Sequence, residues 1–394
     1  MTMGMTEPFS TTMPKGYVGP PSTRHNWNAS FDRVHRVVIA TQSICPTLER
    51  LQNGDLLAGL YSWVFRQGER EFAVKLTRSK DGGLTWSEPT ILAGPPEFKF
   101  AHSHHGMTQI SNGTILYPFN AQDQGRLSSW LTRSTDNGHS WSQPAKISPE
   151  GAGTGPDLRL TCCYGKIREF TDGQVILPIW GSLNGEMVNG FFKSPDGGET
   201  WNKFVTVSRD FGGETDYMEL PDGRFIAVMR IVSHEGHGMA PLYWCYSEDG
   251  EQWDKPKPAW NMYGHSPCLF LTNKGRLMCA YRYVGDLDTG IVGVSFSILR
   301  EPTDNIIPPY YWSLPNHIWL GSTWGTTAAW KINRCGYPSI VQVDSNRILC
   351  VYCMSWTLKS IGGADTPVLY MGYAHDVEGV FFDEEEDTKM AATS

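Results

Sequence analysis

Ser79-Lys-Asp81-Gly-Gly83-Leu-Thr-Trp86 is the stretch that decides the fold, because it recurs along the chain. Two more full copies are Ser134-Thr-Asp136-Asn-Gly138-His-Ser-Trp141 and Ser194-Pro-Asp196-Gly-Gly198-Glu-Thr-Trp201, and Ser247-Glu-Asp249-Gly250-Glu-Gln-Trp253 is one residue shorter. Asp can bond its own backbone, Gly accepts a positive φ, and Trp packs on the strand beneath, so each copy predicts a hairpin turn. The copies begin at residues 79, 134, 194 and 247, which are 55, 60 and 53 residues apart. This is about the length of one four-stranded blade, so the sequence predicts an all-β propeller.

A second repeat sets the number of blades. An apolar strand, a polar turn and another apolar strand recur six times, with turns at Asn53-Gly54, Asn112-Gly113, Asp172-Gly173, Asp222-Gly223, Lys274-Gly275 and Ser345-Asn346. Six turns predict six blades, while the long interval from 275 to 346 leaves a seventh blade open. We expect residues 36–40 to close the ring as the outer strand of the last blade.

Composition narrows the class of protein and its partners. The chain has 394 residues and a net charge of −8, which argues against nucleic acid, and no apolar run is long enough to span a membrane. Residues 1–28 are polar and rich in Pro and Gly, so we expect a flexible segment followed by a single propeller domain over 29–394. No secretory signal is evident, and the nine cysteines, an odd number, favour free thiols. We therefore expect a cytoplasmic monomer, or a secreted one if a signal was removed.

Counting from the six turns predicts which side chains meet at one end of the ring. We call this end the mouth: it is where the innermost strand of each blade starts and the next strand ends. Nine residues before the turn lie Cys45, His104, Tyr164, Glu214, Ser266 and Tyr337, and seven residues after it lie Tyr61, Asn120, Trp180, Arg230, Arg282 and Cys353. A shift of one residue would bring His105 or His265 forward, because side chains alternate along a strand. Two arginines at one mouth suit a carboxylate, so we expect an acidic oligosaccharide or polysaccharide as the substrate.

The S-x-D-x-G-x-x-W repeat is the Asp-box, and the chain resembles the sialidase-like (BNR-repeat) superfamily of β-propellers. This resemblance implies that Arg230 and Arg282 bind a carboxylate, that Tyr337 is a nucleophile and that Glu214 assists it. The implied activity is that of a retaining exo-glycosidase. The third arginine and the acid aspartate of the family have no match, since the first segment is Thr41-Gln-Ser43-Ile-Cys45-Pro46 and residues 63–75 contain no Asp.

A histidine run, Ala101-His102-Ser103-His104-His105-Gly106, precedes the second inner turn. Adjacent histidines on a strand point to opposite faces, so only His102 with His104, or His105 alone, can face one centre. The run is open to three interpretations: a zinc site, although no partner motif at zinc spacing accompanies it, a catalytic histidine, or a hydrogen-bonded structural one. A neutral histidine can remove the C5 proton of a uronic acid. His105 or His104 would then be the base, and Tyr164 or Tyr337 the acid.

Within the superfamily the chain resembles the L-rhamnose-α-1,4-D-glucuronate lyases. The resemblance implies β-elimination that releases terminal L-rhamnose from arabinogalactan caps, with His105 as the central catalytic residue. It implies no required cofactor and leaves room for a bound calcium ion. We expect the substrate to contact Trp180, Asn120, Tyr61 and His265 as well as the two arginines. The alternatives are a sialidase-like hydrolase that uses Tyr337 and Glu214, and a carbohydrate-binding propeller without catalysis.

Overall fold

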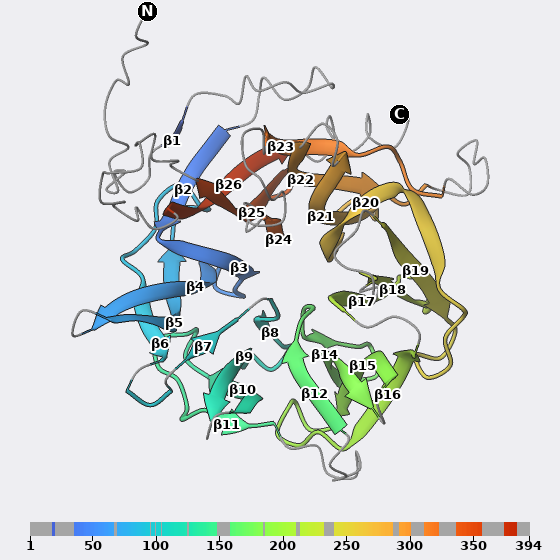
Figure 1. Cartoon of the computed structure of the whole chain (residues 1–394), viewed down its shortest axis with the longest axis horizontal. Helices are drawn as coiled ribbons and strands as arrows, with labels where there is room; N and C mark the ends of the chain where they lie inside the picture. Colours follow the sequence, from blue (N-terminus) through green and yellow to red (C-terminus); the bar gives the residue numbers. More distant parts are fainter. Residues whose placement is uncertain are drawn as a thin grey trace, which may run out of the picture.

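The computed structural model describes fifteen stretches of the chain: residues 18–19, 35–66, 69–94, 96–98, 100–103, 105–123, 126–147, 158–183, 186–209, 213–231, 240–286, 291–300, 311–322, 336–356 and 374–383. Every element assigned in them is a strand, and the strands follow one another around a central axis (Figure 1). The segment 1–28, predicted to be flexible, lies outside the described residues except for the short strand β1 (Val18–Gly19).

The first three blades are separate antiparallel sheets. Blade 1 contains β3 (Ser43–Arg50), β4 (Leu56–Arg66), β5 (Glu69–Ser79) and β6 (Thr90–Ala93). Blade 2 contains β7 (Ala101–His102), β8 (Thr108–Gln109), β9 (Ile115–Asp123), β10 (Arg126–Ser134) and β11 (Ala145–Lys146). Blade 3 contains β12 (Leu158–Cys163), β13 (Arg168–Glu169), β14 (Val175–Leu183), β15 (Glu186–Ser194) and β16 (Lys203–Ser208).

Blades 4 and 5 share one long strand. Blade 4 contains β17 (Thr215–Glu219), β18 (Phe225–Met229), β19 (Pro241–Ser247) and the first part of β20 (Lys257–Leu271). The second part of β20 is the inner strand of blade 5, followed by β21 (Leu277–Asp286), β22 (Ile291–Ile298) and β23 (Asn316–Ser322). The described strands between residues 275 and 346 therefore belong largely to blade 5, which accounts for much of that long interval.

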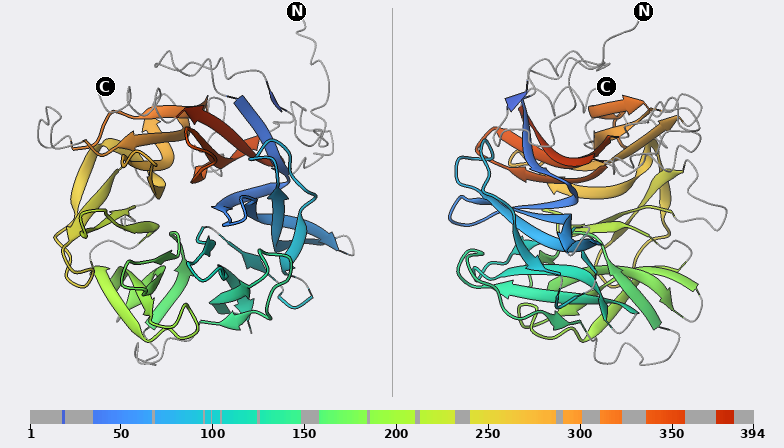
Figure 2. Two further views of the ribbon diagram at one scale, coloured as in Figure 1. Left: turned by 180° about the vertical axis from the view of Figure 1, so that it is seen from behind. Right: turned by 60° about the vertical axis from the view of Figure 1, so that its left-hand side comes forward.

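The last blade closes the ring with the predicted strand. It contains β24 (Gly336–Gln342), β25 (Arg347–Trp356), β26 (Ala374–Asp383) and, on its outer side, β2 (His35–Thr41). In Figure 1 the blue β2 lies beside the dark red β26, and the views of Figure 2 agree. The Arg36 guanidinium on β2 pairs with the Glu378 carboxylate on β26, and the Tyr352 hydroxyl donates to the same carboxylate. With this blade the described strands, which form five hydrogen-bonded sheets, fall into six groups. The number of blades stays a prediction.

The Asp-boxes adopt the turn that their sequence predicts. In the first copy Ser79 Oγ donates to Asp81 at 2.8 Å and accepts the Gly83 N–H at 2.8 Å. Asp81 in turn accepts the Thr85 N–H at 2.9 Å. The Trp86 indole donates to the Gly83 carbonyl at 2.9 Å, and its ring packs in the apolar cluster between blades 6 and 1. Each residue type of the motif thus has a structural partner within the turn.

A cation just before each of the first three Asp-boxes joins neighbouring blades. Arg78 donates to the Asn137 carbonyl, and Arg133 donates to the Gly198 carbonyl. The third cation, Lys193, lies 2.5 Å from a carboxylate oxygen of Glu251. In each case the partner belongs to the Asp-box of the next blade, so the repeat also fastens one blade to another. The fourth copy has Tyr246 at this position.

The innermost strands are joined by a buried carboxylate, that of Asp216, which is fully buried. It accepts the Lys166 N–H at 3.0 Å, the Arg168 guanidinium at 3.0 Å and the Leu269 N–H at 2.7 Å. These donors come from blades 3 and 5, on either side of blade 4. The Lys166 ammonium also lies 2.5 Å from the Glu49 carboxylate of blade 1. This network joins four of the described blades near the axis.

We predict that Asp216→Asn strongly destabilises the fold. An amide cannot neutralise Arg168, and it brings an N–H group toward donors that need an acceptor. Breaking a buried ion pair from one side costs about 3–5 kcal/mol of unfolding free energy. Urea denaturation measures this loss. The matched control is Asp222→Asn at an exposed inner turn, which should change the value by less than about 0.5 kcal/mol. Equal, small effects of both substitutions would contradict this role of Asp216.

Candidate active site

Three inner strands carry an unusual backbone conformation where they meet the mouth. Cys45, Ser266 and Tyr337 have positive φ values of 50°, 55° and 51°, although none of them is glycine. Each is followed by proline in the sequence and lies within a register shift of its strand pair. Bulges of this kind re-aim side chains at functional sites. All three positions are among those that the turn count predicted for the mouth.

Glu214 and Arg230 meet at the mouth end of blade 4. The Arg230 N–H donates to the Glu214 carbonyl at 2.9 Å, and Arg230 Nη1 lies 3.3 Å from Glu214 Oε2. The same carboxylate oxygen accepts the Ser266 N–H at 2.9 Å and lies 3.0 Å from Ser266 Oγ. Glu214 is 7% exposed, so the pair lies in a mostly desolvated position where these bonds are strong.

Tyr337 shares the electrostatic surroundings of Glu214 and both arginines. Its pKa lies well above the ordinary value because the ring is buried and because the Glu214 charge disfavours a phenolate. Arg282 and Arg230 act in the opposite direction on the same pKa. The Tyr337 hydroxyl is therefore protonated at neutral pH and needs a base before it can act as a nucleophile.

Arg282 reaches this position because Gly336 leaves room for it. A Cβ atom on Gly336 would lie only 2.6 Å from the Arg282 Cβ, and Gly336 has a φ of 111° that suits glycine. Among the described residues, the buried Nε of Arg282 has no hydrogen-bond partner. A guanidinium N–H without a partner at a polar mouth is suited to an incoming carboxylate.

His105 and Tyr164 lie among the inner strands and bind prolyl carbonyls of other blades. His105 Nε2 lies 3.1 Å from the Pro338 carbonyl oxygen of blade 6, and the Tyr164 hydroxyl donates to the Pro267 carbonyl of blade 5 at 3.2 Å. The two rings stack with centroids 5.6 Å apart, and Tyr164 lies 6.4 Å from the Tyr337 ring. These contacts tie blade 2 to blade 6 and blade 3 to blade 5, which are not neighbours in the ring.

The protonation state of His105 follows from its contacts. Burial lowers its pKa from 6.5 to about 4, so the ring is neutral at neutral pH. A carbonyl oxygen only accepts hydrogen bonds, so Nε2 carries the proton and Nδ1 carries a lone pair. That Nδ1 is buried and has no hydrogen-bond partner within the described stretches of the chain. His105 is thus a neutral base that is 1% exposed.

The other predicted residues have mixed placements. His104 lies outside the described residues. Trp180 is half-buried within β14, and His265 lies opposite Arg282 in the β20–β21 register. Tyr61 is 7% exposed, and its ring stacks on the Phe72 ring with the two centroids 5.2 Å apart.

Asn120 contacts the scaffold. It is fully buried, and its side-chain oxygen accepts the Cys163 N–H of blade 3 at 3.2 Å. The Ser129 hydroxyl donates to the same oxygen at 3.1 Å. The structure therefore gathers Glu214, Arg230, Arg282 and Tyr337, while Asn120 joins two blades.

Sequence reasoning assigned no role to two residues that the structure makes prominent. The turn count placed Ser266 at the mouth, but its contact with Glu214 joins residues that lie 52 positions apart in the sequence. The only sequence signal for this contact was the proline that follows Ser266. Glu71 on β5 has a buried carboxylate oxygen, Oε2, without a hydrogen-bond partner in the described part of the chain. It lies in the segment where the resemblance led us to expect an aspartate.

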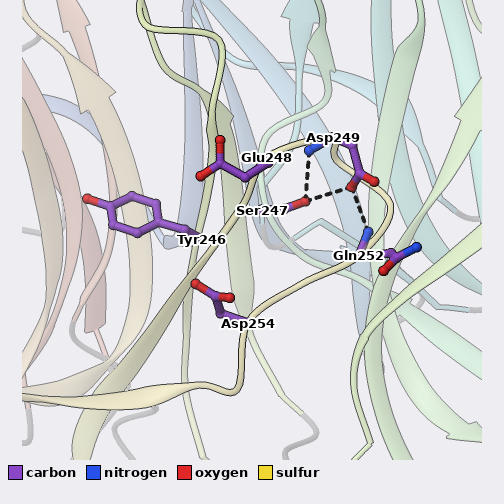
Figure 3. A pocket seen from close by; sticks show the side chains of 6 residues that line it. All are labelled: Tyr246, Ser247, Glu248, Asp249, Gln252 and Asp254. Atoms are coloured by element: carbon purple, nitrogen blue, oxygen red, sulfur yellow. Dashed lines mark hydrogen bonds between the residues drawn. The ribbon is translucent and has the colours of Figure 1, made fainter.

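Among the described residues, no group of three or more His, Cys, Asp or Glu side chains could hold a metal ion. Figure 3 shows a groove at the fourth Asp-box, lined by Tyr246, Glu248, Asp249 and Asp254. The Asp249 carboxylate there already accepts the Gln252 N–H at 2.8 Å, so it stabilises the turn.

No described helix is long and apolar enough to cross a membrane.

Comparison with known proteins places this architecture in a family. Residues 120–345 match the BNR repeat-like domain, and the chain belongs to that family. An exo-alpha-sialidase of Aspergillus fumigatus is 25% identical over 175 residues, which cover 40% of this chain and 38% of that protein. The match thus spans less than two fifths of this relative's length.

Two solved structures share the fold. A Dyadobacter fermentans protein of unknown function has a TM-score of 0.66 at 20% identity, covering 89% of this chain and 98% of that one. A Trypanosoma rangeli sialidase in complex with sialic acid has a TM-score of 0.56 at 13% identity, covering 96% of this chain and 59% of that one. The chain is therefore a sialidase-like β-propeller, and the Trypanosoma rangeli sialidase with this fold was solved in complex with a sugar, sialic acid.

We predict that His105 makes stability fall between pH 6.5 and pH 4. The unfolded chain binds more protons than the folded one in this window, so the free energy of unfolding decreases as pH falls. The full contribution, about 3 kcal/mol, is present above pH 6.5. His105→Phe retains a ring against Tyr164 and should reduce the drop between pH 7 and pH 4. Denaturant titrations measure it, with exposed His139→Gln as the control. The prediction is wrong if both variants keep the wild-type slope.

Proposed function

We propose that the protein is an exo-acting glycosidase that removes a terminal sugar bearing a carboxylate. The observation that carries this proposal is the placement of Glu214, Arg230, Arg282 and Tyr337 in one buried electrostatic neighbourhood. The family membership and the exo-alpha-sialidase relative support it. Arg282 and Arg230 would bind the carboxylate, because two guanidinium groups offset its charge and fix its orientation.

The chemistry follows from the protonation states. Glu214 takes the Tyr337 proton while the Tyr337 oxygen bonds to the anomeric carbon and the glycosidic C–O bond breaks. The leaving oxygen takes a proton from an acid, for which Glu71 is the candidate. Water then attacks the anomeric carbon and gives a proton to that acid, and the Tyr337 oxygen leaves and regains its proton from Glu214. Overall, one glycoside and one water give two free sugars.

We predict that Glu214→Gln lowers kcat by about 10²–10⁴, the usual range for loss of a general base. The test incubates the enzyme with a sialoside and with a glucuronate-capped arabinogalactan and measures the released sugar. Glu199→Gln, an exposed Asp-box substitution, is the control and should retain wild-type turnover. Undiminished turnover by Glu214→Gln would rule out this role.

A second candidate is the uronate lyase, which the neutral His105 favours. His105 Nδ1 would take the C5 proton of the uronate, a C4–C5 double bond would form, and the C4–O bond would break. The leaving oxygen would take a proton from Tyr164 or Tyr337. For a rhamnose-capped glucuronate, the products would be free L-rhamnose and an unsaturated uronate.

Ultraviolet absorbance separates the two candidates, because only elimination makes the conjugated uronate. For the glycosidase we expect released sugar without new absorbance, and we expect His105→Phe to give the same products as the wild type. Release of rhamnose together with absorbance, abolished by His105→Phe, would replace the hydrolase by the lyase. A chain that binds these sugars and releases nothing would be a binding propeller.

A further inference from the structure

Ser266 occupies a backbone conformation that its residue type does not favour. Its φ is 55°, in the left-handed region, and the proline that follows restricts it further. The side chain is fully buried. Strained backbone of this kind persists only where surrounding contacts hold it, so the contacts of Ser266 indicate what the strain maintains.

Those contacts converge on one atom. The Ser266 N–H and hydroxyl both lie within 3.0 Å of Glu214 Oε2, and Arg230 Nη1 approaches the same oxygen at 3.3 Å. The β20–β21 register shifts between His265 and Cys268, so the bulge turns the Ser266 N–H toward blade 4. The next carbonyl, that of Pro267, accepts the Tyr164 hydroxyl. The same bulge therefore supplies hydrogen-bond partners to both Glu214 and Tyr164.

We propose that Ser266 is a positioning residue that keeps Glu214 ionised and oriented. Donors to a carboxylate favour its charged form, and two donors from one residue also fix the rotation of the carboxyl group. The base function of Glu214 rests on the glycosidase proposed above. The charge that Ser266 holds in place is also the charge that raises the pKa of Tyr337.

The test uses Ser266→Gly, which accepts a positive φ and retains the N–H while it removes the hydroxyl donor. We expect the pKa of Glu214 to rise, so the acid limb of kcat/KM moves up by roughly half to one pH unit. We expect kcat to fall about three- to tenfold at neutral pH. Thermal stability should fall only slightly, because the relief of backbone strain offsets part of the loss of the buried hydroxyl bond to Glu214. A purely structural role would leave the acid limb unmoved.

The matched control is Asn137→Gly, which relieves the same kind of backbone strain at an Asp-box, where φ is 57°. It should leave the pH profile of the wild type unchanged. An acid limb that does not move in Ser266→Gly, or that moves equally in Asn137→Gly, overturns the proposal.

A second readout needs no substrate. Infrared titration follows the carboxylate band that Glu214→Gln removes, and this band should titrate at higher pH in Ser266→Gly than in the wild type. If the wild type cleaves no carboxylated glycoside, the glycosidase proposal fails, while the infrared shift still decides the role of Ser266. An unshifted band would refute the role even in an active enzyme.

Discussion

A buried charge near the axis constrains how the inner strands of this propeller meet. The Asp216 carboxylate is tolerated only because donors from blades 3 and 5 surround it. A strand that slipped by one residue would leave that charge without its donors. Glu214 lies two positions earlier and shares its strand face, so the same anchor that fixes the interior also places the carboxylate at the mouth.

The residues between this anchor and the mouth connect blades that do not touch along their sheets. His105 and Tyr164 bind the carbonyls of Pro338 and Pro267, and the residues before these prolines are Tyr337 and Ser266. A proline has no N–H to donate to a strand ladder, and its carbonyl here faces the interior instead. The dipeptides Tyr337-Pro338 and Ser266-Pro267 thus each supply one residue at the mouth and one carbonyl that binds His105 or Tyr164.

Much of the fold could be predicted because its signals are local. The Asp-box turns depend on residues within eight positions, and the closing strand at 36–40 follows from the count of blades. The blade-joining cations were missed, although Arg78, Arg133 and Lys193 occupy one repeated position.

The site was harder to predict because it depends on contacts between distant residues. The turn count assumes regular alternation, whereas bulges at Cys45, Ser266 and Tyr337 break it. Local sequence also could not show that Asn120 would bind a backbone N–H of the next blade. The convergence of Glu214 with Arg230 was predicted, since both positions count from the same turn.

The shared strand β20 has a consequence for how the molecule moves. Because it runs unbroken from blade 4 into blade 5, Glu214, Arg230, Ser266 and Arg282 are attached to one continuous hydrogen-bonded sheet. Tyr337 belongs to a different sheet, in blade 6. Collective displacements of blades on the microsecond scale would therefore carry the two arginines and the glutamate as a single body. Tyr337 can change its distance from that body only if blade 6 moves against blade 5, and the close approach of Gly336 to Arg282 limits such movement.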